Sequence, residues 1–209
     1  PAPAVTGDWN GDGHADLAVA YGLDRVVTLL GDGHARLRPA VTRTVPRGPS
    51  TLAAADLDRD GVPDLLSANR DSNTLSVLMG DGAGGFSRQL ALPVGLRPKS
   101  LVSADLDGDG WPEVAVANWI ENSISVLRNA RGTLRPAAAL RALAGPFTLA
   151  AGDLDGDGAP DLVAANLEGK ALGVYLGDGA GGFAAPAHLA VPDEPVGLAL
   201  FDVNGDGAL

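Results

Sequence analysis

A single acidic motif recurs along this chain at a nearly constant interval, and this interval limits the fold more than any other feature. The segments DWNGDGHADL, DLDRDGVPDL, DLDGDGWPEV and DLDGDGAPDL begin at Asp8, Asp56, Asp105 and Asp153, and DVNGDGAL begins at Asp202. Successive copies are 48 or 49 residues apart. A fixed period of this length is typical of stacked structural repeats, because one such unit cannot bury its apolar faces alone.

Each repeat contains four short apolar segments in a fixed order. One segment precedes the acidic motif, as in STLAAADL, and one follows it, as in LLSAN; a third, such as LSVLM, leads to a Gly-rich turn and a fourth segment. Each segment has four to eight residues bounded by Gly, Pro, Asn or Asp, which indicates strands. Four strands in about 48 residues are typical of a propeller blade. We therefore expect an all-β protein, a β-propeller of four-stranded blades forming an open arc of four blades plus the start of a fifth.

The period also divides the chain into units of a single β-propeller segment. These units are residues 1-48, 49-97, 98-145 and 146-194, followed by a partial unit at 195-209. Both ends carry a first strand, PAVTGDW and VGLALFDV, whereas ring closure requires ends that complete one shared blade. The exposed strand edges of such an open segment invite pairing with another chain. We therefore expect the 209 residues to be part of a longer chain.

Composition excludes several classes of function. The net charge of −11 argues against nucleic-acid binding, which needs a basic face. No segment approaches the roughly 18 apolar residues of a membrane span. The absence of cysteine excludes disulfides and thiolate chemistry. Most of the 26 acidic residues lie inside the repeated motif, and outside it Lys and Arg outnumber Asp and Glu.

The repeated motif reads D-x-[DN]-x-D-G-x-x-[DE], and it has the composition of a metal-binding loop. Side-chain oxygens stand at positions 1, 3, 5 and 9, Gly at position 6 allows a sharp bend, and the carbonyl of position 7 adds an oxygen. Ca²⁺ takes six to eight oxygen ligands in a tolerant geometry, whereas Mg²⁺ needs a strict octahedron. Without a cation the carboxylates would repel one another. We therefore expect Ca²⁺ in four complete sites and a fifth, incomplete one.

Two other interpretations of the motif are less favourable. An EF-hand requires a Glu at position 12 between two helices, but position 12 holds Val19, Ser67, Val116 or Ala164 within strand-like sequence. A metal-free Asp-Gly surface turn is common in single copies. Four complete copies of the acidic motif favour a metal-binding loop over a metal-free turn.

The stretches ADLDGDGWPEVAVAN, ISVLRN and VLMGDGAGGF resemble FG-GAP repeats and the closely similar VCBS repeats. This resemblance covers essentially the whole chain. It implies the propeller found in integrin α-subunits, which has seven blades, and in many bacterial secreted proteins. It also implies an extracellular or cell-surface location and Ca²⁺ in the loop between the first and second strands of each blade.

The resemblance assigns the metal ligands residue by residue. The side-chain ligands of the four complete loops are Asp8, Asn10, Asp12 and Asp16; Asp56, Asp58, Asp60 and Asp64; Asp105, Asp107, Asp109 and Glu113; and Asp153, Asp155, Asp157 and Asp161. The carbonyl ligands are those of His14, Val62, Trp111 and Ala159. The fifth loop holds Asp202, Asn204 and Asp206 and ends before position 9.

No catalytic or cofactor-binding constellation emerges. GDGAGG at 80–85 and 177–182 matches a dinucleotide-binding pattern, but a strand-like segment follows it where a helix is required. The histidines His14, His34 and His188 share no ligand spacing.

We expect a calcium-binding propeller segment of a secreted or cell-surface protein, not an enzyme, that serves adhesion, ligand binding or a structural scaffold. A protein or glycan ligand would bind the face opposite the acidic loops, which carries Arg47, Arg70, Arg97, Lys99, Trp119, Arg141 and Lys170. Trp119 is either a stacking platform there or an isolated surface residue. The alternative is the propeller part of an extracellular polysaccharide-degrading enzyme, for which Glu121, Glu168, Asp193 and Glu194 show no site-like spacing.

Overall fold

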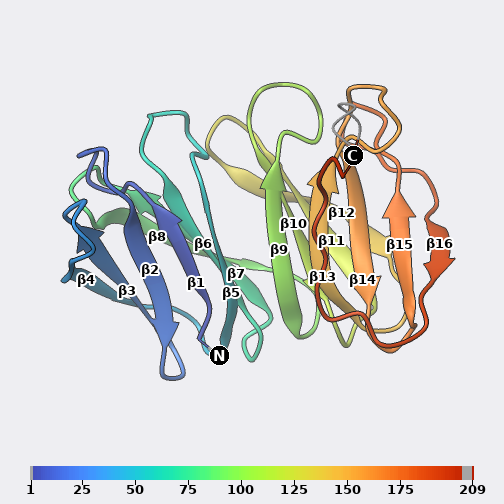
Figure 1. Cartoon of the computed structure of the whole chain (residues 1–209), viewed down its shortest axis with the longest axis horizontal. Coiled ribbons are helices and arrows are strands. Elements are labelled where there is room, and N and C mark those ends of the chain that lie inside the picture. The colour runs from blue at the N-terminus through green and yellow to red at the C-terminus, as the bar shows by residue number, and fades with distance from the viewer. Residues whose placement is uncertain (1, 204–208) are drawn as a thin grey trace. The chain divides into compact units, whose positions relative to one another are not determined.

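All regular structure is β-strand in the part of the chain that the computed structural model describes, residues 2–203 and Leu209 (Figure 1). The first sheet consists of β1 (Ala4–Gly7), β2 (Asp16–Tyr21), β3 (Arg25–Gly31) and β4 (Leu37–Thr44). The second consists of β5 (Pro49–Ala55), β6 (Asp64–Asn69), β7 (Thr74–Gly80) and β8 (Phe86–Pro93). The third consists of β9 (Pro98–Ala104), β10 (Glu113–Asn118), β11 (Ser123–Asn129) and β12 (Leu134–Arg141). The fourth consists of β13 (Pro146–Gly152), β14 (Asp161–Asn166), β15 (Ala171–Tyr175) and β16 (Ala187–Ala190).

Each sheet is built from four consecutive antiparallel strands in the order in which they occur along the chain. This is the up-and-down arrangement of a propeller blade, so the predicted all-β fold of four-stranded blades is confirmed. None of the described sheets combines strands from the two ends of the chain, as expected for an open series of blades.

The chain divides into two compact units, Pro1–Pro98 and Lys99–Leu209. In the first unit, Trp9 from the acidic loop packs with Leu52, Leu65, Leu78 and Phe86 of the second sheet. In the second unit, Leu106, Ile124, Leu149, Leu162 and Tyr175 form the corresponding cluster across its two sheets. The middle strand β14 has all six residues buried, whereas β16 is exposed along its length. Branched and small apolar side chains therefore hold neighbouring sheets together within each unit.

A fully buried asparagine ends the second strand of three sheets: Asn69, Asn118 and Asn166. The Asn69 amide donates to Thr74 Oγ1 at 3.1 Å and to Ser76 Oγ at 2.9 Å, and its Oδ1 accepts from Ser67 Oγ at 3.0 Å. The Asn118 amide donates to Ser123 Oγ and Ser125 Oγ. Buried polar groups need such partners. The asparagines therefore fix the turn that leads into the third strand.

The expected first strand of a fifth unit, in VGLALFDV, is not formed, because residues 191–203 contain no strand. In this fold a first strand pairs with the second strand of its own sheet, as β1 pairs with β2, and the described residues 195–203 hold no second strand. Val196 instead accepts a hydrogen bond through its carbonyl from Thr148 Oγ1 at 3.0 Å. Within the described residues there is no helix with the length and hydropathy needed to cross a membrane.

Candidate metal-binding loops

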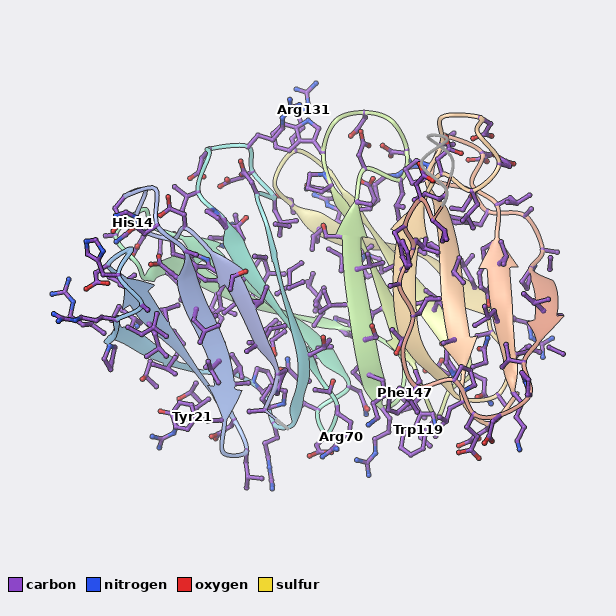
Figure 2. The ribbon with its side chains drawn as sticks, in the orientation of Figure 1. His14, Tyr21, Arg70, Trp119, Arg131 and Phe147 are labelled. Atoms are coloured by element: carbon purple, nitrogen blue, oxygen red, sulfur yellow. The ribbon has the colours of Figure 1, made fainter. Side chains whose placement is uncertain are left out.

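The four complete acidic loops all connect the first and second strands of their sheets. Position 9 of each loop is the first residue of the second strand: Asp16, Asp64, Glu113 and Asp161. In the first unit, His14 marks the loop end of the strands, and Tyr21 and Arg70 lie at the opposite end (Figure 2). The sequence motif therefore occupies the same place in every blade.

Each loop is curled by hydrogen bonds to its own carboxylates. The backbone N–H of position 6 donates to the carboxylate of position 1 at 2.9–3.0 Å in all four loops. The backbone N–H of position 7 donates to the carboxylate of position 5 at 2.8–2.9 Å. The position 6 glycines, such as Gly61 and Gly158, have φ values of 88° and 87°, where a side chain would be strained. The loop backbone thus holds its side-chain oxygens in a compact arrangement.

Carboxylates converge in the second, third and fourth loops. Carboxylate oxygens lie within 4.8 Å of one another in three groups: Asp56, Asp58 and Asp60; Asp105, Asp107 and Glu113; and Asp153, Asp155 and Asp161. Groups of this kind could hold a metal ion. The first loop forms no such carboxylate group in the described chain, because its position 3 is an amide: Asn10 Nδ2 donates to Asp12 Oδ2 at 2.9 Å. In the fifth loop, Asn204 and Asp206 lie outside the described residues.

The position 9 carboxylates have a structural role that sequence reasoning missed. Each is only 1% exposed. One oxygen accepts from the backbone N–H of position 2. The other accepts from a backbone N–H at the end of the third strand or, for Gly177, two residues beyond it, as far as 16 residues away. All eight of these hydrogen bonds are 2.8–3.0 Å long. Position 9 therefore fastens the loop to the sheet, whether or not it also contacts a metal.

The electrostatics of the second and third loops disfavour bare carboxylates. Burial raises the pKa of Asp64 to about 6, against backbone hydrogen bonds from Gly80 and Leu57, and Asp58 and Asp60 raise it further. Burial is also the largest cause that raises the pKa of Glu113. Burial and the charges of Asp60 and Asp56 raise the pKa of Asp58. A cation at this end would relieve the repulsion.

One buried atom in the third loop tests whether the residues fit a metal. Asp105 Oδ1 is buried and accepts no hydrogen bond, although the other oxygen accepts from Gly110. A buried, unpaired carboxylate oxygen is costly unless it contacts a cation. The converging donors are all oxygens, which suit a hard cation such as Ca²⁺ and not a metal that prefers nitrogen or sulfur. The residues therefore fit the ion that the sequence predicts.

A different cluster forms at the opposite end of the second unit. Lys99 Nζ lies 5.3 Å from the ring centroid of Trp119 and 4.7 Å from that of Phe147. Figure 2 shows these two aromatic side chains close together, and Trp119 Nε1 donates to Glu168 Oε1 at 3.0 Å. Trp119 is therefore not the isolated surface residue considered from the sequence. Phe147 was missed, because its contact with Lys99 joins two different strands.

The other residues predicted for this face are placed as follows. In the first unit, Arg70 and Arg97 both bind Asp71, at 3.0 and 2.7 Å. In the second unit, Lys170 lies 3.7 Å from the exposed Asp193. Arg47 contributes to lowering the pKa of Asp71, and the carbonyl of Arg141 accepts from the Tyr175 hydroxyl at 2.9 Å. Arg70, Arg97 and Lys170 therefore already form ion pairs with neighbouring carboxylates.

Consecutive four-stranded sheets, each with an oxygen-rich loop between its first and second strands, define a repeat protein built from β-propeller blades. The family model described as an FG-GAP-like repeat matches residues 8–67, 56–116, 105–164 and 153–209. The chain therefore belongs to the FG-GAP-like repeat family, as its resemblance predicted. A search of curated proteins found no match.

Solved structures with the same fold are remote in sequence. BBS1N, crystallised in complex with ARL6DN, is 14% identical with a TM-score of 0.65. A functionally unknown protein from Desulfotomaculum acetoxidans is 12% identical with a TM-score of 0.64. A candidate 6-phosphogluconolactonase from Bacteroides fragilis is 16% identical with a TM-score of 0.68. Each comparison covers 93% of this chain but only 56–57% of the other chain, and at these identities it shows the fold alone.

Proposed function

We propose that this chain is a calcium-binding propeller segment of a secreted or cell-surface protein, and that it presents a ligand-binding surface and does not catalyse a reaction. The observation that carries calcium binding is the convergence of three carboxylates in each of three successive loops. The buried, unpaired Asp105 Oδ1 supports it. Calcium would be held by the side chains of positions 1, 3, 5 and 9 and the carbonyl of position 7, and it would neutralise their charge.

Melting experiments test the calcium role. Extracellular modules bind Ca²⁺ at about 10⁻⁴–10⁻³ M, and a site at ten times its Kd stabilises the native state by about 1.4 kcal/mol. With several filled sites, the melting temperature should rise clearly between a chelator and 5–10 mM Ca²⁺. Mg²⁺ at the same concentration is the control for ionic strength. An unchanged melting temperature together with no heat of binding in calorimetry would reject the proposal.

The proposed ligand surface is the cluster of Lys99, Trp119, Phe147 and Glu168. It combines large aromatic area with both signs of charge, which suits a protein or glycan ligand. A likeness in fold to BBS1N, whose structure contains a protein partner, is consistent with a protein ligand. The test is a glycan array and a protein pull-down with wild type and Trp119→Ala. Ligands retained equally by both proteins would argue against this surface.

A further inference from the structure

Arg128 is a charged residue at a place where the other three blades are apolar. Arg128 directly precedes Asn129, whose backbone N–H donates to the position 9 carboxylate of Glu113. The residues at the same place in the other blades are Leu30, Met79 and Leu176. Arg128 lies at the end of β11, directly opposite Arg135 of β12. A position that carries apolar side chains in the other blades therefore places a permanent positive charge beside the third loop.

The Arg128 guanidinium is held by two groups. Its Nε lies 3.1 Å from Asp107 Oδ2, and the Asp107 side chain is only 9% exposed. Its Nη2 donates to the carbonyl of Ala180, in the Gly-rich turn of the fourth sheet, at 2.7 Å. Gly181 makes room for this contact, since a Cβ there would lie 2.7 Å from Nη2. The Arg128 side chain is 51% exposed, but its guanidinium is held from two sides.

Asp107 occupies position 3 of the third loop, and it is one of the three carboxylates that converge there with Asp105 and Glu113. The fourth loop offers a matched comparison, because its first six residues, DLDGDG, are identical. There Leu176 replaces Arg128, and Asp155 takes part in no ion pair in the described chain. Beyond these six residues the loops differ at position 7, Trp111 against Ala159, and at position 9, Glu113 against Asp161. Only the third loop has an arginine side chain paired with its position 3 carboxylate among the described ion pairs.

We propose that Arg128 competes with Ca²⁺ for Asp107 and thereby makes the third loop a weaker calcium site than the fourth. The inference rests on the proposed calcium binding. The guanidinium neutralises one ligand, and a divalent ion bound beside it meets like-charge repulsion. The loops of one chain therefore fill at different calcium concentrations. When Ca²⁺ binds the third loop, Arg128 loses its ion pair with Asp107. Because Arg128 also donates to the Ala180 carbonyl, this change reaches the Gly-rich turn of the neighbouring blade.

Trp111 at position 7 makes the third loop separately observable. Tb³⁺, which replaces Ca²⁺ at oxygen sites, luminesces when an adjacent indole transfers its excitation energy, and the signal that Trp111→Phe removes belongs to the third loop. In Arg128→Leu, the Trp111-dependent signal should reach half-saturation at roughly 2- to 5-fold lower Tb³⁺, as expected for losing one competing ion pair. Ca²⁺ displacement of the bound Tb³⁺ should show the same shift.

Arg135→Leu is the matched control, because it removes an equal charge from the facing strand without breaking the contact to Asp107. It should shift half-saturation much less. Arg128→Gln removes the charge but keeps a neutral N–H donor near the place of Nε, beside Asp107, and it should shift half-saturation in the same direction as Arg128→Leu even if the leucine variant folds poorly. Unchanged half-saturation in both Arg128 variants, or an equal shift in Arg135→Leu, would overturn the inference. Absence of binding by every loop in the wild type would instead reject calcium binding itself.

Discussion

Asp64 Oδ1 accepts a hydrogen bond from the backbone N–H of Gly80 at 2.8 Å, and this contact joins the start of β6 to the end of β7. The other Asp64 oxygen accepts from Leu57 N at 2.9 Å. One buried side chain thus closes the acidic loop on itself and fastens it to the sheet. The same pair of contacts recurs at Asp16, Glu113 and Asp161.

Asp64→Ala should destabilise the protein even without metal. It removes two hydrogen bonds to a buried carboxylate, each worth about 1.5–3 kcal/mol, so a loss of roughly 2–5 kcal/mol is expected in urea unfolding with chelator present. Asp58→Ala is the control, because Asp58 is exposed and its negative charge is repelled by Asp56 and Asp60. It should be neutral or slightly stabilising in chelator. Equal losses for both variants would contradict the structural role of Asp64.

Asp155→Asn should affect only the calcium-loaded protein. Asp155 is exposed and converges with Asp153 and Asp161, so under the proposed calcium binding its charge would contribute to holding the ion and little to the metal-free fold. We expect a wild-type melting temperature in chelator and a smaller calcium-induced increase. Calorimetric titration should show one site weakened and the others retained. A variant that melts early in chelator would point to a structural role for Asp155 instead.

Tyr175 should make the protein sensitive to high pH. Burial raises its pKa to about 12, and its hydroxyl donates to the Arg141 carbonyl. The folded state holds this proton more tightly than the unfolded chain, whose tyrosine titrates near 10. The stabilisation of the folded state by the protonated Tyr175 is therefore complete below pH 10 and is lost between pH 10 and 12.

At pH 11 the loss amounts to about 1.4 kcal/mol. The measurement is urea unfolding at pH 8 and pH 11 in wild type and Tyr175→Phe. The difference in unfolding free energy between the two proteins should shrink by that amount at the higher pH. A constant difference would show that Tyr175 ionises as easily in the folded state as in the unfolded chain.

Asn69→Ala should cost more stability than Asn118→Ala. Asn69 makes three side-chain hydrogen bonds, with Ser67, Thr74 and Ser76. Asn118 donates two, and its Oδ1 is buried without a partner, so its removal also removes an unsatisfied group. We expect the Asn69 variant to be roughly 1 kcal/mol less stable than the Asn118 variant in chemical denaturation. The reverse order would show that cavity formation dominates over hydrogen bonding.

Local features of the sequence predict much of this molecule. The 48–49-residue period and the short apolar segments define four sheets and place each acidic loop between a first and a second strand. The position 6 glycines predict the bend, because only Gly adopts these backbone angles without strain.

Contacts that depend on strand register could not be predicted. The reach of Asp64 to Gly80 and of Arg128 to Asp107 requires knowing which residues face each other across neighbouring strands. The meeting of Lys99, Trp119 and Phe147 brings together three separate parts of the second unit. The unformed first strand of a fifth unit shows the same limit, since a strand needs a partner as well as an apolar sequence.

Because every sheet contains only consecutive strands, its hydrogen bonds are completed within one repeat length. Contacts that are close in sequence require little loop closure, so such topologies fold rapidly for their size. A blade can therefore begin to form during synthesis as soon as its own four strands have left the ribosome. A duplication or loss of one unit in the gene would likewise change the number of blades without rethreading the remaining sheets.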